Sequence, residues 1–208
     1  MKKIFKWTFI GIIIVLFGYL ISVTIVDVHL MGLVQPLYSR HIEKTSFLIE
    51  DSTRTDLQEG FKCSAFSCAY LLRHRGINVH GDSIYEIMPN KMDNGYVYPK
   101  GIISFLERNN FTVGYYTGNI AALKNEIAKG NPAIVMIKIR PDKDWLHYVP
   151  VIGYSADSLF IAESIPELCN VKGKKYNRSI SNKDFEVLWN TRAFKMPLYG
   201  NTFIIANR

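Results

Sequence analysis

The longest hydrophobic run of the chain lies at its start. Residues 7–26 carry no charged side chain, and three lysines precede them, while no further Lys or Arg appears before Arg40. An apolar run of about 20 residues is long enough to cross the hydrocarbon core of a bilayer. Because basic residues favour the cytoplasmic side, we expect residues 1–26 to form a single-pass anchor with a cytoplasmic N-terminus and an extracytoplasmic remainder.

A cleaved signal peptide is the alternative interpretation of this run. The run exceeds the usual apolar region of a signal peptide, about 7–15 residues, and no small-x-small cleavage site clearly follows it. A buried helix of a soluble domain is disfavoured because the run is apolar on every face. We therefore predict an uncleaved signal anchor in the cell membrane.

The pattern of hydrophobic and polar positions divides the rest of the chain in two. Residues 27–54 are mixed in polarity and contain Pro36, so we interpret them as a juxtamembrane connector. Residues 55–208 are enough for one well-buried domain. Apolar spacing in the first part of this domain favours helices over residues 64–75, from an N-cap at Asp82 or Ser83 to near Pro89, after Pro99, and over residues 120–129.

Residues suited to helix ends support these boundaries. Gly76 is suited to follow a helix, and Asn119 is suited to cap the start of one. Ser181 with Asp184 forms a capping-box-like start of a further helix that reaches Trp189.

β-branched and apolar runs predominate in the second part of the domain. Strands are predicted over residues 112–116, 133–139, 147–154, 159–163 and 201–206. The runs 147–154 and 159–163 are close enough in sequence to form a hairpin. Helices followed by such strands indicate an α+β domain, with N-terminal helices packed on a C-terminal antiparallel sheet.

Charge adds little to this picture. The formal net charge of +7 is spread along the chain, without a dense stripe of Lys and Arg interleaved with aromatic residues. We therefore expect no nucleic-acid partner.

The cysteine at the start of the first predicted helix of the domain is the strongest candidate for chemistry. The positive end of the helix dipole favours a thiolate at Cys63, and an apolar helix face follows it. Gln58, five positions upstream, could donate its amide to an oxyanion together with the backbone N–H of Cys63. The alternatives are a buried structural thiol and an ordinary loop glutamine.

A base and an orienting acid come from the predicted hairpin. His147 begins one strand and could take the proton of the thiol, whereas Glu163 ends the next strand and could orient the imidazole. In a plain hairpin centred on Ala156 and Asp157, these two side chains lie on opposite faces of the sheet. The pairing therefore requires an odd-length turn or one bulge, for which Pro150 or Gly153 is the natural place. Otherwise Glu163 would be a solvated edge carboxylate.

The remaining cysteines suggest a structural role and not metal binding. Cys68 and Cys169 could form a disulfide, or both could be small buried hydrophobic residues. The cysteines and His147 lack a recognised metal-ligand spacing, so no metal or other cofactor is predicted. Asn177-Arg178-Ser179 matches a glycosylation sequon.

The residues from Gln58 through the helix after Cys63, and the run 147–154 followed by an acid, resemble a known family. They are similar to the double-glycine leader (bacteriocin-processing) peptidases, family thirty-nine of the papain-like cysteine peptidases, in a stand-alone, membrane-anchored form. The resemblance implies a papain-like fold with Cys63 as nucleophile, His147 as base, Glu163 as orienter and Gln58 at the oxyanion hole. The chain departs from the family pattern at Ser64, where glycine is usual, and at Glu163, where aspartate is usual.

The expected function is that of a thiol hydrolase outside the cytoplasm, a cysteine peptidase acting on a peptide or protein substrate. One alternative is an acyltransferase or amidase that forms the same acyl-enzyme on envelope peptides. Another is a non-catalytic binding module on the same fold.

Overall fold

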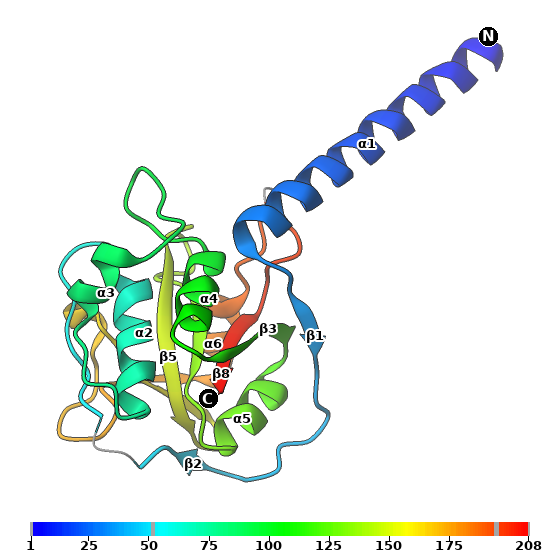
Figure 1. Ribbon diagram of the computed structural model, residues 1–208. Coiled ribbons are helices and arrows are strands. Elements are labelled where there is room, and N and C mark those ends of the chain that lie inside the picture. The colour runs from blue at the N-terminus through cyan, green and yellow to red at the C-terminus, as the bar shows by residue number, and fades with distance from the viewer. Residues whose placement is uncertain (1, 51–52, 194–195, 208) are drawn as a thin grey trace.

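The computed structural model describes residues 2–50, 53–193 and 196–207, and its centre is a mixed β-sheet (Figure 1). The described strands form an eight-stranded sheet in the order β1-β3-β8-β4-β5-β6-β7, with β2 paired to β5. The strands are β1 (Gln35–Leu37), β2 (Phe47–Leu48), β3 (Thr112–Gly118), β4 (Ala133–Lys138), β5 (Leu146–Tyr154), β6 (Ser158–Ile161), β7 (Arg178–Ser181) and β8 (Thr202–Asn207). All pairings are antiparallel except that of β1 with β3.

Helices cover both faces of this sheet. The described helices are α1 (Lys2–Met31), α2 (Cys63–His74), α3 (Gly81–Ile87), α4 (Pro99–Arg108), α5 (Ile120–Ala128) and α6 (Asn182–Trp189), with a 3-10 turn, η1 (Pro166–Leu168). Side chains alternate along a strand, so Met136 and Tyr148 face a core shared with α2, α3 and α4, whereas Val135 and Val149 face a core shared with α5 and α6. The α+β class is confirmed, and α5 and α6 form a second helical layer beyond the single one that we expected.

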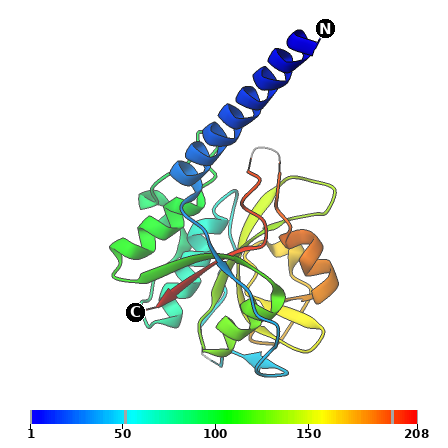
Figure 2. The ribbon, with the colours of Figure 1, turned by 90° about the vertical axis from the view of Figure 1, so that its right-hand side faces the viewer.

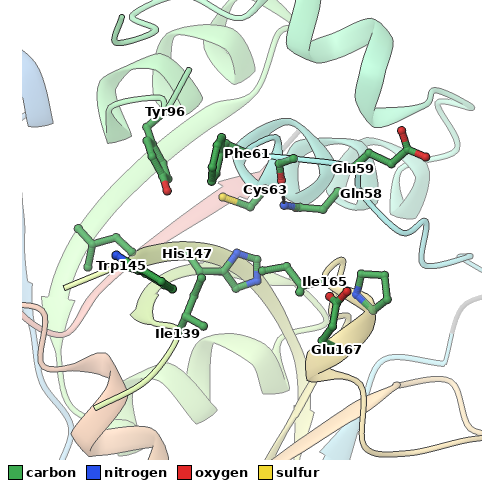
Figure 3. Close-up of a pocket in the computed structure, with 13 residues that line it drawn as sticks. Gln58, Glu59, Phe61, Cys63, Tyr96, Ile139, Trp145, His147, Ile165 and Glu167 are labelled. Atoms are coloured by element: carbon green, nitrogen blue, oxygen red, sulfur yellow. Dashed lines mark hydrogen bonds between the residues drawn. The ribbon is translucent and has the colours of Figure 1, made fainter. Parts of the chain in front are cut away.

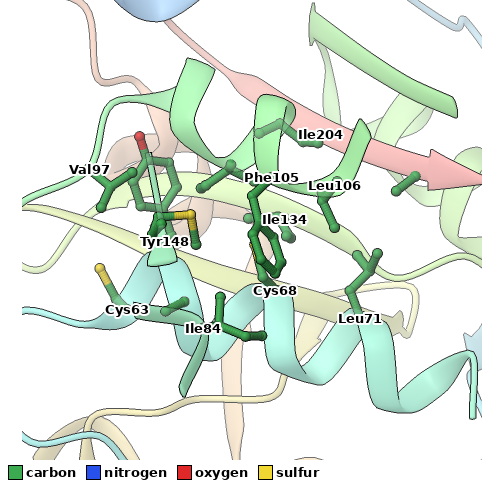
Figure 4. Close-up of a cluster of buried hydrophobic side chains, with 14 of the residues drawn as sticks. Cys63, Cys68, Leu71, Ile84, Val97, Phe105, Leu106, Ile134, Tyr148 and Ile204 are labelled. Carbon is green, nitrogen blue, oxygen red and sulfur yellow. The ribbon is translucent and has the colours of Figure 1, made fainter. Parts of the chain in front are cut away.

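The helix that carries the candidate cysteine is fixed in the first core. Ten of its twelve residues are buried. Figure 4 shows Cys68 of this helix packed with Phe105, Leu106 and Tyr148 between α2, α4 and β5. The helix ends as expected, because Gly76 adopts a positive φ of 79° that suits glycine. This packing holds the first turn of α2 against the sheet.

Most predicted helix caps are confirmed. The side chain of Asn119 accepts from Ala122 N, and that of Ser181 accepts from Asp184 N. The predicted N-cap of α3, Asp82 or Ser83, is wrong, because the N-cap is His80. The helix begins at Gly81, because the imidazole of His80 accepts from Asp82 N and serves as the cap.

The N-terminal helix is longer than the predicted anchor of residues 1–26. It continues to Met31, which is buried in the first core, and the hydroxyl of Tyr199 donates to Gly32 O at 2.7 Å. Lys100 Nζ donates to His29 O at 3.1 Å. The last turn of α1 is therefore part of the packed domain, while most of the helix projects away from it (Figures 1 and 2).

The predicted connector of residues 27–54 also differs from expectation. After the end of α1 it contributes β1, at the edge next to β3, and β2, which pairs with the end of β5. Both strands are too short to show a period-2 pattern in the sequence. Their pairing with distant strands stabilises them.

The hairpin of β5 and β6 contains the bulge that the candidate triad requires. Next to the turn, Tyr154 faces Leu159 and Gly153 faces Phe160, but Val151 faces Ile161. The extra residue on β5 is therefore Ile152, beside Gly153. A side chain at Gly153 would clash with β2, because a Cβ there would lie 2.7 Å from Phe47 O. The absence of a side chain at Gly153 therefore lets β2 pair with β5 beside the bulge.

Candidate active site

Cys63 is the first residue of α2 and lines a cleft. Intrahelical bonding begins with Ala65 N, which donates to Lys62 O at 3.0 Å. The N–H groups at the start of a helix lack intrahelical acceptors and point out of its N-terminus. The thiol and these donors thus lie at the same end of the helix, as Figure 3 shows for the Cys63 side chain.

His147 and Glu163 meet behind this thiol. The imidazole Nε2 lies 2.7 Å from Glu163 Oε1, and both side chains are buried. The other side of the ring faces the Cys63 thiol (Figure 3), and an interaction with this thiol helps to raise the pKa of the imidazole. Cysteine, histidine and glutamate therefore form a continuous chain of polar contacts from α2 through β5 to the residue two places beyond β6.

This chain of contacts favours a protonated imidazole. Burial of the ring lowers the pKa of His147, but the Glu163 carboxylate and the hydrogen bond with Cys63 outweigh it and raise the pKa to about 9. Burial likewise raises the pKa of Glu163, but the charge and hydrogen bond of His147, with smaller contributions from Ile165 N and Arg178, lower it to about 2. At neutral pH the pair is therefore an imidazolium and a carboxylate.

Two residues that the sequence analysis missed hold Glu163 in place. Arg178, the first residue of β7, is buried, and its Nη1 lies 2.7 Å from Glu163 Oε2. The side-chain amide of Asn177 accepts from Glu163 N at 2.7 Å and donates to Glu163 O at 2.8 Å. The sequence analysis treated both residues only as part of a sequon. The sequence held one signal for a buried Arg178: this arginine stands two positions before the apolar Ile180 in a short strand.

Gln58 lies beside Cys63 in the loop before α2. Its Oε1 accepts from the hydroxyl of Ser164 at 2.7 Å, and its Nε2 donates to Gly60 O at 2.7 Å. Its backbone N donates to Ser164 O at 2.8 Å. These bonds fix the orientation of the amide, and one N–H of Nε2 remains for another acceptor because an amide NH2 has two donors.

The cleft has a volume of about 800 Å³ and two chemically different ends. Gln58, Cys63 and His147 line its middle. Tyr96 and Trp145 lie toward one end, and Glu59 and Glu167 lie toward the other (Figure 3). Among the described residues that line the cleft there is no lysine or arginine, although the chain carries a net charge of +7.

The other cysteines lie outside this cleft. All three cysteines are within the described residues and are free thiols, so the possible disulfide between Cys68 and Cys169 is not formed. Burial raises the pKa of the fully buried Cys68 far above that of an ordinary thiol. No group of three or more His, Cys, Asp or Glu side chains within the described ranges could hold a metal ion.

Several solved structures share this fold. The peptidase domain of Streptococcus ComA, a bi-functional ABC transporter, matches with a TM-score of 0.57 and 15% identity over 74% of this chain and 97% of that chain. A double-glycine-motif protease from an AMS/PCAT transporter, in complex with the leader peptide, matches with a TM-score of 0.52 and 16% identity over 84% and 98%. Xylellain, a cysteine protease from Xylella fastidiosa, matches with a TM-score of 0.52 and 12% identity over 84% and 94%.

The comparison with protein families agrees with these structures. No curated protein matches the chain. The model of the Peptidase_C39 like family matches residues 52–195, a range that includes all four candidate site residues. The chain therefore belongs to the C39-like peptidase family and has its papain-like fold.

Proposed function

We propose that this protein is a membrane-anchored, extracytoplasmic cysteine peptidase. The observation that supports the activity best is that His147 contacts Glu163 on one side and faces the Cys63 thiol on the other, beside a cleft. Nucleophile, base and orienter within hydrogen-bond reach are the signature of an activated thiol. An identity of 12–16% to solved peptidases supports only the fold. The proposal of activity therefore depends on the geometry of the site.

The reaction begins with attack of the Cys63 thiolate on the carbonyl carbon of a peptide bond. Negative charge then develops on the carbonyl oxygen, where the free N–H of Gln58 and the backbone N–H of Cys63 can stabilise it. His147, protonated at neutral pH, gives its proton to the leaving amine. Water, deprotonated by the neutral imidazole, then hydrolyses the acyl-enzyme.

Glu163 and Arg178 act behind this chemistry. The Glu163 carboxylate stabilises the imidazolium and holds the ring with Nε2 turned away from the cleft. Arg178 occupies the second oxygen of the carboxylate, which leaves the first oxygen for the imidazole. We assign Arg178 as a positioning residue, because it acts through Glu163.

The experiment uses the full-length protein in detergent with a peptide mixture, and mass spectrometry identifies the products. Wild type should cleave peptides, Cys63→Ser should not, and Cys169→Ser is the matched control because its thiol lies outside the cleft. Transfer of the acyl group to an added amine in preference to water would support the acyltransferase alternative. Peptide binding without cleavage, with no labelling of Cys63 by a thiol-directed active-site probe, would support the binding module.

The anchor is supported by one described helical segment, Lys6–Met31, that is long and apolar enough to cross a membrane. The contact of Tyr199 with Gly32 attaches the end of this helix to the domain. A reporter fused after Arg208 should be active only outside the membrane, and the protein should stay in the membrane fraction. A soluble mature form that lacks about the first 26 residues would contradict the anchor.

A further inference from the structure

The last turn of α1 is attached to the domain by burial and by two hydrogen bonds. Met31 is buried in the first core, the hydroxyl of Tyr199 donates to Gly32 O at 2.7 Å, and Lys100 Nζ donates to His29 O at 3.1 Å. The helix therefore leaves the domain in a defined direction. With α1 in a bilayer, the end of the domain from which it leaves faces the bilayer surface.

Three loops lie at this end of the domain (Figures 1 and 2). They are residues 88–98 between α3 and α4, residues 139–145 between β4 and β5, and the described part of residues 190–201 between α6 and β8. One residue from each loop lines a small cavity together with the last residue of α1: Met92, Trp145, Met196 and Met31. The three loops and the end of α1 thus form one continuous surface, which we call the anchor-side surface.

Large apolar side chains are exposed on the anchor-side surface. Leu33, two residues beyond α1, is 70% exposed, Trp145 is 59% exposed and Leu198 is 46% exposed. Lys143 Nζ lies 6.0 Å from the centre of the Trp145 ring. Tryptophan is enriched at membrane–water interfaces, where its ring lies at the level of the lipid headgroups. Leucine and tryptophan on a face that also carries lysine are typical of elements that lie on a bilayer surface.

Basic side chains outnumber acidic ones on the same surface. Arg140 and Lys138 each form an ion pair with an aspartate of the β4–β5 loop, so these four charges cancel. The other described charges of the three loops and the start of α4 are four cations and one carboxylate: Lys91, Lys100, Lys143, Arg192 and Asp93. Lysine and arginine near a bilayer are attracted to anionic lipid headgroups. The excess of positive charge therefore complements an anionic membrane.

We infer that the anchor-side surface docks on the bilayer that α1 crosses. Leu33, Trp145 and Leu198 enter the headgroup region, and the cations contact anionic headgroups. The inference rests on the proposed anchor and adds a second contact with the membrane. Because α1 already holds the domain at the bilayer, even a weak surface contact is occupied. Docking holds the cleft, which Trp145 also lines, at the membrane surface.

Tryptophan fluorescence of the full-length protein in vesicles tests the docking. The vesicles contain phosphatidylcholine and phosphatidylglycerol brominated near the headgroup, because bromine quenches an indole that it contacts. The chain has three tryptophans, of which Trp7 lies in α1 and Trp189 is fully buried. Trp7→Phe therefore reports Trp145, and Trp7→Phe with Trp145→Phe leaves only the emission of Trp189. The blue emission of this buried indole also shows that each variant is folded.

A tryptophan at the opposite end of the domain is the matched control. Ala156 is exposed in the turn between β5 and β6. The nine residues of β5 separate this turn from Trp145 by about 30 Å, at about 3.3 Å per residue. Ala156→Trp is therefore added to the variant that lacks Trp7 and Trp145.

Brominated vesicles should quench a large part of the Trp145 emission and none of the emission of the Ala156→Trp control. Quenching of Trp145 should weaken in vesicles of phosphatidylcholine alone and with Arg192→Glu, but not with Lys183→Glu, an exposed lysine on α6 beside the β5–β6 turn. Unquenched Trp145 in protein that floats with the vesicles would overturn the docking and keep the anchor. Protein that does not float with the vesicles would refute the anchor and the docking together.

The charge contribution has its own outcome. Equal quenching in the two kinds of vesicle, unaffected by Arg192→Glu, would overturn the contact with anionic headgroups. Trp145 emission that responds to added peptide and not to brominated lipid would show that the exposure of this ring serves the cleft alone, which would also overturn the docking.

Discussion

The imidazole Nε2 of His147 lies 2.7 Å from Glu163 Oε1, and a single bulge on β5 makes this contact possible. Without the extra residue Ile152, strand alternation would turn the two side chains to opposite faces of the sheet. The carbonyl of Ile152 accepts from Ile49 N at 3.0 Å, so the segment at β2 bonds the bulged backbone. Part of the predicted connector thus supports the geometry of the site.

Replacement of Glu163 by glutamine should affect both activity and stability. The amide keeps the shape but removes the charge that stabilises the imidazolium, so kcat/KM should fall by roughly 10²–10⁴. Arg178 would lose its buried partner, which should cost about 3–5 kcal/mol of unfolding free energy. Peptide cleavage and urea unfolding measure the two effects, with the exposed Glu186→Gln on α6 as control. Unchanged cleavage would remove Glu163 from the mechanism.

Arg178→Met should shift the pH dependence of cleavage. Arg178 helps to lower the pKa of Glu163, so its loss should raise that pKa and move the acid limb of kcat/KM to higher pH. Arg178→Lys, which retains the charge, should restore the limb in part. A uniform loss of activity in Arg178→Met with an unmoved limb would indicate a purely structural role.

The His147–Glu163 pair should contribute most to the stability of the fold in mildly acidic solution. The pKa of His147 is raised from 6.5 to about 9, so its contribution is complete below pH 6.5 and is lost as the pH rises through 9. The pKa of Glu163 is lowered from 4.5 to about 2, so its contribution is complete above pH 4.5 and is lost as the pH falls through 2.

Urea unfolding of wild type and His147→Ala at pH 5.5, 7.5 and 9.5 tests this dependence. Wild type should lose about 1–3 kcal/mol from the lowest to the highest pH through this pair, and the variant should lack that slope. Parallel profiles for the two proteins would show that His147 does not titrate as the geometry indicates.

Alkylation should distinguish the Cys63 thiol from the Cys68 thiol. Iodoacetamide at about pH 6 should modify Cys63 first, because it lies in the cleft at a helix N-terminus beside a protonated imidazole. Cys68 should stay unmodified in the folded protein because it is fully buried. His147→Ala should slow the reaction of Cys63, as peptide mass spectrometry can measure. Equal labelling of Cys63 and Cys68 would rule out the thiolate–imidazolium pair.

The acidic end of the cleft should favour basic substrates. Peptides with lysine near the cleaved bond should react about two- to fivefold faster than matched peptides with glutamate, and this ratio should shrink with salt because Glu59 and Glu167 are exposed. The double replacement Glu59→Lys and Glu167→Lys should reverse the preference, whereas the exposed Glu107→Lys on α4 should not. The same ratio in all three proteins would show that these carboxylates do not select substrates.

The sequence by itself determined the elements whose local pattern is strong. The apolar N-terminal run, the helix after Cys63, the caps at Asn119 and Ser181, and the strands of the second part follow from side-chain periodicity and local hydrogen bonding. The four candidate residues could be named because nucleophile, base, acid and amide donor are distinct residue types at element ends. Strand alternation even required an odd-length turn or one bulge in the hairpin.

Only the tertiary structure revealed the elements and contacts that depend on residues far apart in the sequence. The short strands β1 and β2 exist because β3 and β5 accept them, and no local pattern reveals such a partner. The final turn of α1 continues past Asp27 because Met31 is buried in the domain core. Arg178 acquires its role from a carboxylate on a neighbouring strand end, since a buried charge is stable only beside a partner that the fold supplies.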